Sequence, residues 1–183
     1  MQCSRCHYRS PLGEILLAAD SEGLTGLWFA GQKHFAHRTC VECGEKNIHV
    51  YEQTTQWLDI YFSGQEPNFT PPLRLTGTTF QVDIWQLLLK IPYGKTTTYR
   101  ELARKISDQR RLTQMSPQAV GGAVGHNAIS IIIPCHRVVG SNGSLVGYAG
   151  GIDRKVQLLT LENVDITKYF TPQNRTKQFG ETT

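Results

Sequence analysis

The sequence predicts an α+β fold in which a small α/β domain is followed by a mainly helical one. Three observations lead to this prediction. Two short apolar runs near the N-terminus are separated by turn residues, which is typical of a β-hairpin. Pro67, Pro71 and Pro72 then interrupt every regular pattern. Beyond them, helical periodicity and helix-capping residues prevail.

The three prolines mark the boundary between the two predicted parts. We assign residues 1–75 to an N-terminal α/β domain, residues 76–166 to a second domain and residues 167–183 to a polar, aperiodic tail. A chain of 183 residues has room for one domain or for two small ones. Because 39% of its residues are hydrophobic, it can bury a core.

The first domain is expected to contain a hairpin and a helix. Residues 14–19 and 24–29 predict two strands, and residues 20–23 are turn formers that join them. Residues 31–47 are polar and rich in breakers, which indicates a loop. A helix is predicted over residues 50–62, where apolar side chains follow helical spacing at Trp57, Leu58, Tyr61 and Phe62. We find no group of reactive side chains here and expect this domain to support the second.

The second domain is expected to begin and end with helices. Thr79 can cap the first of them, and Pro92 with Gly94 ends it. Asp153 can cap the last helix, which runs to about Glu162. The first helix has a single apolar face, formed by Phe80, Ile84, Leu87, Leu88 and Ile91.

Two short helices between these form a helix-turn-helix candidate. Thr98 and Glu101 have the spacing of a capping box, which opens the first of the pair. Ser116 and Pro117 are typical of a helix N-terminus, and this second helix runs to about Gly125.

The second helix of the pair has almost no side-chain bulk. A glycine inside a helix costs up to about 1 kcal/mol relative to alanine, so several glycines need a reason. One explanation is tight packing against another helix, and the other is close approach to a nucleic acid. A helix without long polar side chains suits the minor groove better than the major groove. The small residues are Ala119, Gly121, Gly122, Ala123 and Gly125.

Residues 131–133 form an apolar run that predicts a buried strand, which Pro134 ends. Cys135 follows at the rim of the predicted core, with His136 and Arg137 next to it. A cysteine is a nucleophile only as a thiolate, and a nearby base or positive charge lowers its pKa. Most buried cysteines are nevertheless inert. Neighbours on a strand also point to opposite faces, so a water molecule could separate the thiol from the imidazole.

The residues around this cysteine carry a resemblance to a known family. The segment Pro134-Cys135-His136-Arg137-Val138, with Asn127 eight residues before the cysteine and Gly-Tyr-Ala-Gly-Gly at residues 147–151, resembles the O6-alkylguanine-DNA alkyltransferases. These proteins are also called methylated-DNA–protein cysteine methyltransferases. The similarity runs from about residue 80 to residue 162 and includes residues 10–13 and 57–62. It implies an RNase H-like first domain and a winged-helix-like, helix-turn-helix DNA-binding domain that carries the active-site cysteine.

The resemblance implies DNA repair by stoichiometric alkyl transfer. The protein would flip an alkylated base out of double-stranded DNA from the minor groove, as a monomer and without a required cofactor. The alkyl group of O6-alkylguanine, and of O4-alkylthymine, would pass to the protein's own cysteine and stay there.

The resemblance also implies roles for individual residues. Cys135 would be the nucleophile, His136 its base through a water molecule, Glu162 the group that orients His136, and Tyr99 a donor to the guanine. Asn127 would hold the turns around the site. The residues implied to contact the substrate base are Val138, Tyr148, Val124, Asn127 and Lys155. Those implied to contact DNA are Gln118, Ala119, Gly122, Arg137 and Tyr99.

Three positions depart from the better-known members of the family. Gln118 stands where an arginine usually replaces the flipped base, and glutamine is shorter and uncharged. Ala149 stands where a serine often follows the tyrosine, and Ala128 where a proline often follows the asparagine. None of the three affects the nucleophile.

The charge distribution agrees with a nucleic-acid partner. Between Lys90 and Gln118, seven basic residues and two acidic residues give a formal charge of +5, compared with +4 for the whole chain. Solvation of helix surfaces is the simpler explanation for such residues, but phosphate contacts would make DNA binding salt-sensitive.

The sequence predicts a cytoplasmic protein with no membrane partner. No apolar run approaches the roughly 18 residues that a transmembrane helix needs, and the first ten residues lack an apolar signal region. Four of the five cysteines form two Cys-x-x-Cys pairs, Cys3 with Cys6 and Cys40 with Cys43, a spacing compatible with structural zinc. Because the two pairs lie far apart in sequence, we favour reduced cysteines in an exposed loop and expect no metal.

Two other functions remain open on the residues alone. One is a DNA-binding protein that recognises alkylated bases without catalysis, although the relatives of that kind lack a residue matching Cys135. The other is a cysteine hydrolase that uses Cys135 and His136. It would need an oxyanion hole, which the sequence does not reveal.

Overall fold

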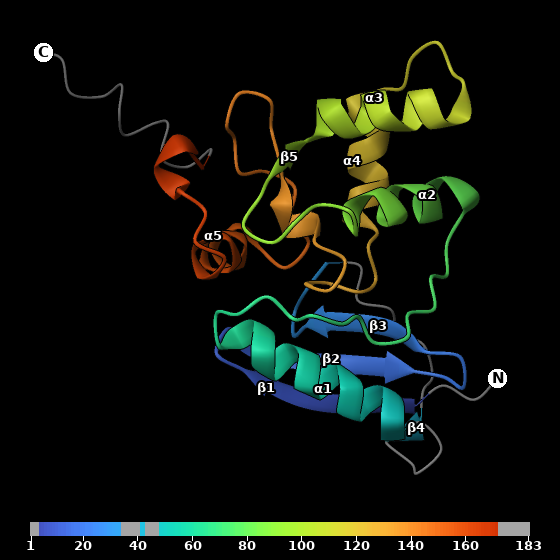
Figure 1. Ribbon diagram of the computed structural model, residues 1–183, viewed down its shortest axis with the longest axis vertical. Coiled ribbons are helices and arrows are strands. Elements are labelled where there is room, and N and C mark those ends of the chain that lie inside the picture. Colours follow the sequence, from blue (N-terminus) through green and yellow to red (C-terminus); the bar gives the residue numbers. More distant parts are fainter. Residues whose placement is uncertain (1–3, 34–40, 43–47, 172–183) are drawn as a thin grey trace, which may run out of the picture.

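The protein, described by a computed structural model over residues 4–33, 41–42 and 48–171, forms two stacked units (Figure 1). A β-sheet with one helix makes the N-terminal unit, and the remaining helices with a two-stranded sheet make the C-terminal unit. This arrangement confirms the predicted α+β class. The N-terminal unit comprises β1 (Ser4–Ser10), β2 (Gly13–Ala19), β3 (Leu24–Phe29), β4 (Val41–Glu42) and α1 (Ile48–Phe62). The C-terminal unit comprises α2 (Thr79–Leu88), β5 (Thr97–Thr98), α3 (Tyr99–Arg110), α4 (Pro117–Gly125), the 3-10 helix η2 (Cys135–Arg137), β6 (Val138–Val139), α5 (Ile152–Leu161) and the 3-10 helix η3 (Ile166–Lys168).

The sheet of the N-terminal unit has the strand order β3-β2-β1-β4. The predicted hairpin is confirmed, since β2 and β3 pair antiparallel with Ile15 opposite Phe29. Strand β1 was not predicted, because its sequence is polar and only alternate residues face the protein. It pairs antiparallel with β2 and parallel with β4.

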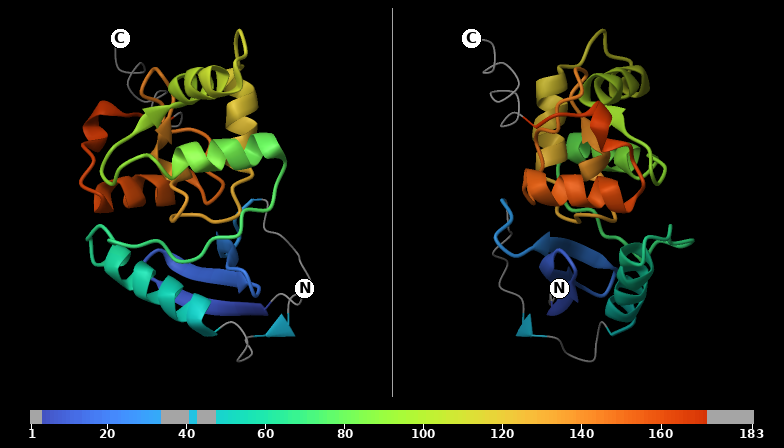
Figure 2. Two further views of the ribbon diagram at one scale, coloured as in Figure 1. Left: turned by 45° about the vertical axis from the view of Figure 1, so that its right-hand side comes forward. Right: turned by 90° about the vertical axis from the view of Figure 1, so that its left-hand side faces the viewer.

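Helix α1 covers one face of this sheet (Figure 2). The predicted helix is confirmed, and the structure starts it two residues earlier. Its buried residues recur every three or four positions, so they form one face towards the core. They are Tyr51, Thr54, Trp57, Leu58 and Tyr61.

The helices of the C-terminal unit begin at capping residues. Thr98 and Glu101 form the predicted capping box at α3, and Ser116 caps α4 as predicted. Two cap predictions were wrong. Thr78, not Thr79, caps α2, because the Thr78 side chain accepts from the amide of Gln81 and completes a capping box. At α5 the capping position is Gly151, and Asp153 lies inside the first turn.

The predicted strand at residues 131–133 is also wrong. These residues form a buried turn, in which Ile131 has a φ of 68° and the amide of Ile133 donates to the carbonyl of Ile129 at 3.1 Å. An apolar run can lie in a buried turn as well as in a strand, since both exclude water. Here the Asn127 side chain binds the amide of Ile129 and the carbonyl of Ile133, so it satisfies backbone groups at both ends of the turn.

The free edge of β3 joins the two units. The amide of Leu24 donates to the carbonyl of Pro72 at 2.8 Å, so the linker pairs with one end of β3. The amide of Leu27 donates to the carbonyl of Ala128 at 2.8 Å, and the amide of Ser130 donates back to Leu27 at 2.9 Å. The edge of the first sheet therefore holds the segment that leads to Cys135.

One apolar core runs through both units, and a smaller cluster lies beneath α5 and η3. Among the described residues, no helix combines the length and the apolar character needed to cross a membrane. Part of the predicted tail is ordered, because Phe170 exchanges backbone hydrogen bonds with Gly143 and Leu145. Residues 172–183 of that tail lie outside the described part of the chain.

Candidate active site

Cys135 is buried at the start of η2, with 3% of its surface exposed. The turn before it is organised by Asn127. The Asn127 amide nitrogen donates to the carbonyl of Ile133 at 2.8 Å and to the Cys135 Sγ at 3.2 Å. Its Oδ1 accepts from the amide of Ile129 at 3.0 Å. One side chain thus shapes the turn and binds the sulfur.

The surroundings of the thiol act on its pKa in opposite directions. Burial raises the pKa of Cys135, while the Asn127 amide and the positive charge of Lys155 lower it without cancelling the effect of burial. Cys135 is therefore a thiol in the free protein near neutral pH. A thiolate would form only when a base takes its proton.

Lys155, on α5, is fully buried. Its Nζ donates to the carbonyl of Val138 at 2.5 Å and to that of Val146 at 2.8 Å. Burial lowers the pKa of Lys155 to about 8, so the ammonium group remains mostly charged at neutral pH. The structure thereby places a buried cation close enough to lower the pKa of Cys135.

Glu162, immediately after α5, is the centre of a buried hydrogen-bond network. Its Oε1 accepts from His136 Nε2 at 2.7 Å and from the Tyr61 hydroxyl at 2.7 Å. Arg137 donates to both oxygens, at 2.8 and 3.0 Å, and the amide of Gly94 donates to Oε2 at 3.1 Å. Burial raises the pKa of Glu162, but hydrogen bonds from His136 and Arg137 outweigh it and lower the pKa to about 2. Glu162 is therefore a carboxylate.

This carboxylate selects the tautomer of His136. Because Glu162 accepts from Nε2, the proton of the neutral imidazole lies on Nε2 and the lone pair lies on Nδ1. The Nδ1 atom is buried and has no hydrogen-bond partner among the described residues. Burial lowers the pKa of His136, which Glu162 opposes without reversing. His136 is thus a neutral imidazole with its basic nitrogen unused.

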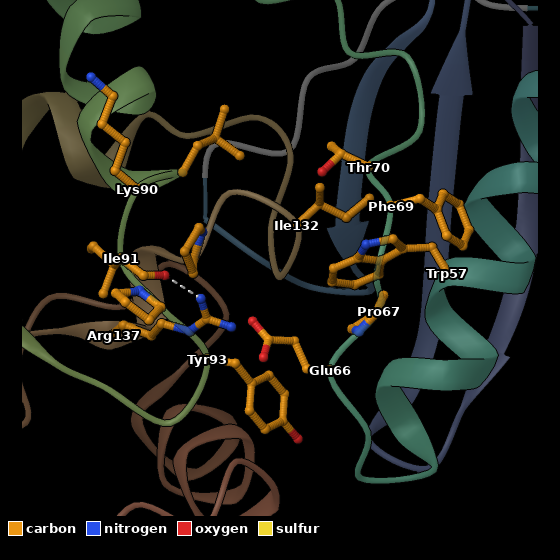
Figure 3. Close-up of a pocket in the computed structure, with 13 residues that line it drawn as sticks. Trp57, Glu66, Pro67, Phe69, Thr70, Lys90, Ile91, Tyr93, Ile132 and Arg137 are labelled. Carbon is orange, nitrogen blue, oxygen red and sulfur yellow. Dashed lines mark hydrogen bonds between the residues drawn. The ribbon is translucent and has the colours of Figure 1, made fainter.

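Arg137 is buried rather than exposed. We predicted a DNA contact, but its guanidinium is buried between Glu162 and the carbonyl of Ile91, to which Nη1 donates at 2.6 Å. Figure 3 shows Arg137 beside the ring of Tyr93, at the edge of a cleft of about 160 Å³ between the linker and the C-terminal unit. The guanidinium is engaged by Glu162, and a contact of Arg137 with DNA stays a prediction. Cys135 does not line this cleft.

Two tyrosines flank the thiol. The Tyr99 hydroxyl donates to the carbonyls of Val146 and Gly147, at 3.2 and 3.3 Å, and burial raises the pKa of Tyr99 to about 12. Gly147 has a φ of +73°, and a Cβ there would lie 2.5 Å from the Tyr99 oxygen, so glycine is required. The buried ring of Tyr148 meets the ring of His136 edge-on at 6.3 Å.

The remaining predicted base contacts are apolar. Val124 and Val138 are buried, on α4 and β6. Burial raises the pKa of Tyr148, as does the negative charge that Cys135 would carry as a thiolate. Val124, Val138, Tyr148 and Cys135 all belong to the main apolar core.

Helix α4 has an exposed side at its first two turns. Gln118, Ala119 and Gly122 are exposed. A Cβ added to Gly122 or to Gly125 would meet nothing within 4 Å. Tight packing against the described residues therefore does not explain these two glycines.

Four cysteines have a spacing compatible with zinc ligands. The structure describes Cys6, whereas Cys3, Cys40 and Cys43 lie outside the described residues. Cys6 is a free, half-buried cysteine on β1. Within the described ranges, no group of three or more histidine, cysteine or acidic residues could hold a metal ion.

Tyr61 is a site residue that was not predicted. Its spacing on α1 indicated a core residue, and it is fully buried, but its hydroxyl joins Glu162 in the other unit. The only signal in the sequence was general: a buried tyrosine needs a partner for its hydroxyl.

Comparisons with known proteins cover most of the chain. Residues 6–75 match the family model of the 6-O-methylguanine DNA methyltransferase ribonuclease-like domain, and residues 79–164 match that of the 6-O-methylguanine DNA methyltransferase DNA binding domain. The chain is 41% identical over 156 residues to the methylated-DNA–protein-cysteine methyltransferase of Methanosarcina acetivorans, covering 85% of this chain and 95% of the relative. It is 40% identical over 162 residues to the protein of the same name from Mycobacterium leprae, covering 88% and 93%.

Solved structures of the same family are also similar to this chain. The crystal structure of the Mycobacterium tuberculosis O6-methylguanine methyltransferase is similar with a TM-score of 0.75 and 39% identity, covering 88% of this chain and 93% of that one. The M. tuberculosis OGT in complex with DNA is similar with a TM-score of 0.74 and 35% identity, covering 92% and 98%.

Proposed function

The chain belongs to the methylated-DNA–protein-cysteine methyltransferase family and is a DNA-repair alkyltransferase, in which we propose that Cys135 accepts the alkyl group. The observation that carries this assignment is the buried set of Asn127, Cys135, His136 and Glu162, in which Asn127 binds the thiol and Glu162 holds the neutral imidazole of the following residue.

The reaction is a displacement at the alkyl carbon. The sulfur of Cys135 forms a bond to that carbon while the bond between carbon and guanine O6 breaks. The electron pair of the broken bond stays on the guanine, which gains one proton, and the thiol loses one. Guanine leaves as a neutral base, and the thioether on Cys135 is stable, so each molecule reacts once.

His136 is the base for this reaction. Its Nδ1 is available as an acceptor, because Glu162 holds the proton on Nε2. We propose that the thiol proton passes to Nδ1 through a water molecule, with Glu162 stabilising the imidazolium that forms.

Lys155 and Tyr99 act on the developing charges. The buried ammonium of Lys155 favours the thiolate. The Tyr99 hydroxyl, now bonded to the carbonyls of Val146 and Gly147, would change acceptors and donate to the guanine ring as O6 departs. Val124, Val138 and Tyr148 would enclose the flipped base, either O6-alkylguanine or O4-alkylthymine.

The DNA face is proposed to be helix α4, entering the minor groove. Its exposed residues Gln118, Ala119 and Gly122 leave space for a nearby sugar-phosphate backbone. Basic residues from Lys90 to Arg111 would contact phosphates, so binding should weaken with salt. One chain carries every proposed catalytic side chain, which supports action as a monomer.

We also propose domains at residues 1–75 and 76–166, supported by the separate matches at residues 6–75 and 79–164. A cytoplasmic location is proposed because a nucleophilic thiol must stay reduced. No cofactor is proposed for the transfer, since side chains supply the nucleophile, the base and the acid.

The test is the intact mass of the protein after incubation with duplex DNA that contains O6-methylguanine. We expect a gain equal to one CH₂ unit, because a methyl group replaces the thiol hydrogen, and peptide mapping should place it on Cys135. The Cys6→Ser variant should gain the same mass, and Cys135→Ser should gain none.

Other outcomes would assign another function. An unchanged mass with tight binding to the lesion would indicate recognition without catalysis. Repeated turnover of an ester or amide would indicate a hydrolase. A Cys135→Ser protein that still removed methyl groups from guanine would contradict the assignment of the nucleophile.

A further inference from the structure

A side chain of the N-terminal unit enters the network that holds the proposed base. Tyr61 lies on α1 and is fully buried, with its ring stacked on Trp57 at 5.2 Å between centroids. Its hydroxyl donates to Glu162 Oε1 at 2.7 Å and lies 3.4 Å from His136 Nε2. Tyr61 and Glu162 are 101 positions apart in the sequence.

The geometry makes Tyr61 and His136 share one acceptor atom. Both donate to Glu162 Oε1 at 2.7 Å. A carboxylate offers about four lone-pair sites, and Glu162 receives five hydrogen bonds in all. Three of these bonds reach Oε1, from Tyr61, His136 and Arg137 Nη2. Each of these three donors therefore reduces the negative charge that Oε1 presents to the other two.

We propose that Tyr61 is a positioning residue through which the N-terminal unit sets the proton affinity of His136, by way of the shared oxygen Oε1 of Glu162. This inference rests on the proposed function of His136 as the base for Cys135. It gives the N-terminal unit a part in the reaction beyond supporting the second domain.

Other groups also face His136 and would remain in place when Tyr61 is changed. Glu162 and Arg137 adjoin it in the network, and Lys155 lies on α5. Tyr148 packs edge-on to its ring from the loop before α5, and Cys135 precedes it in η2. A change confined to the Tyr61 hydroxyl therefore isolates a single contribution.

Removal of the hydroxyl should strengthen the bond between His136 and Glu162. With one donor fewer, Oε1 carries more negative charge towards Nε2 and stabilises the imidazolium. In Tyr61→Phe, we expect the pKa of His136 to rise by about half a unit to one unit. A residue that only fastens the two units would change stability and leave this pKa unchanged.

The experiment is NMR of the full-length protein without DNA, with labelled histidine. The His136 signal is identified by its loss in His136→Gln. In Tyr61→Phe, we expect the Nε2 proton at pH 7 to move downfield and the titration of the ring to move to higher pH. Unchanged values for both would overturn the proposal.

Tyr8→Phe is the matched control. The Tyr8 hydroxyl also donates to a carboxylate, Asp59, at 2.7 Å in the same unit, but it does not belong to the network. Tyr8→Phe should leave both His136 signals where they are in the natural protein. A shift of equal size in this control would show that the effect is not specific and would also overturn the proposal.

A second variant covers the case in which Tyr61→Phe does not fold. Replacing Tyr61 alone by 3,5-difluorotyrosine keeps the ring and the hydroxyl but makes the hydroxyl a stronger donor. The His136 pKa should then fall and the Nε2 proton should move upfield. Shifts in the opposite direction, or none, would contradict the shared-oxygen mechanism.

The pH dependence of the rate of alkyl transfer tests separately whether His136 is the base. If the natural protein transfers methyl groups, the acid limb of its single-turnover rate should move to higher pH in Tyr61→Phe by the shift measured by NMR. An acid limb that stays in place while the pKa moves would show that His136 is not the base. If the natural protein transfers none, the proposed function fails, while the NMR result still decides the coupling between Tyr61 and His136.

Discussion

At the scale of single residues, the site buries ionisable groups whose charges depend on one another. Arg137 and Lys155 are cations, and Glu162 is an anion, so the cluster carries one net positive charge while Cys135 is a thiol and His136 is neutral. The loss of one proton from the cluster makes it neutral overall. Burial keeps Cys135 an unreactive thiol in the free protein, and Asn127 and Lys155 offset part of the cost of forming the thiolate.

Of the two buried cations, Lys155 should lower the pKa of Cys135 more than Arg137 does. The charge of Lys155 acts on Cys135, whereas Arg137 is paired with Glu162. In Lys155→Met, we expect the pKa of Cys135 to rise by about one unit or more, since an opposite charge is lost. The measurement is thiolate absorbance against pH, with the spectrum of Cys135→Ser in the same background subtracted.

The control for this prediction is Lys168→Met. Lys168, on η3, is an exposed lysine that pairs with Asp165, the residue before this helix. The Lys168→Met variant should leave the pKa of Cys135 unchanged. An unaltered thiol pKa in Lys155→Met would mean that Lys155 only holds the carbonyls of Val138 and Val146.

At the scale of elements, α4 is a helix whose composition opposes its own stability. Its glycines reduce helix propensity, and Gly122 and Gly125 gain no packing contact inside the protein in return. The composition of α4 therefore agrees with the external contact that we propose for its exposed side. The proposed partner is the minor groove of DNA.

The Gly122→Ala variant should separate stability from binding. Alanine at this position should raise the free energy of unfolding by up to about 1 kcal/mol, because it favours the helix and meets no neighbouring atom. Affinity for duplex DNA should fall severalfold, because the methyl group occupies the proposed contact surface. Urea unfolding and fluorescence anisotropy with labelled DNA measure the two effects.

Gln56→Ala provides the comparison for Gly122→Ala. Gln56 is exposed on α1, away from α4, and its replacement improves helix propensity slightly. DNA affinity should not change. If Gly122→Ala bound DNA as tightly as the natural protein, α4 would not approach DNA at this residue.

At the scale of the whole molecule, the edge of β3 and the linker hold the two units together. Arg74 on the linker forms ion pairs with Asp20 and with Glu22 in the turn between β2 and β3. Asp20 is buried, and the pKa of Asp20 is lowered because hydrogen bonds from Glu22 and Arg74 outweigh the effect of burial. These two ion pairs of Arg74 fix the linker against the sheet.

The Arg74→Ala variant should lose about 1–3 kcal/mol of unfolding free energy at pH 7, because Asp20 stays buried without its main cation. A carboxyl whose folded pKa is lowered stabilises the fold above its unfolded pKa, and that contribution is lost as the pH falls through the folded value. The difference between variant and natural protein should therefore narrow below about pH 3.8, the ordinary value for Asp20. Urea unfolding at several pH values measures it.

The control for Arg74→Ala is Arg104→Ala. Arg104 pairs with Asp108 on α3 at 3.9 Å, and both side chains are largely exposed. Such a surface pair contributes about 0–1 kcal/mol, so its loss should be small at every pH. A loss as large as that of Arg74→Ala would mean that burial of Asp20 does not matter.

Much of this molecule follows from local patterns in the sequence. The β2–β3 hairpin, the helices α1 to α4, the capping box at Thr98 and the cap at Ser116 depend on residues within a few positions of each other. The α+β class follows from their order along the chain. The position of the candidate nucleophile beside a histidine was also visible, because Cys135 and His136 are neighbours.

Tertiary structure alone decided how the site is held. The run of residues 131–133 became a turn because the Asn127 side chain bonds its backbone, and apolar character cannot reveal such a bond. Arg137 turned inward because Glu162, 25 positions away, offers it a carboxylate. Tyr61 joined the same carboxylate from the other unit. Local patterns specify where helices and turns occur, but the partner of a buried polar group is whichever group the fold brings within reach.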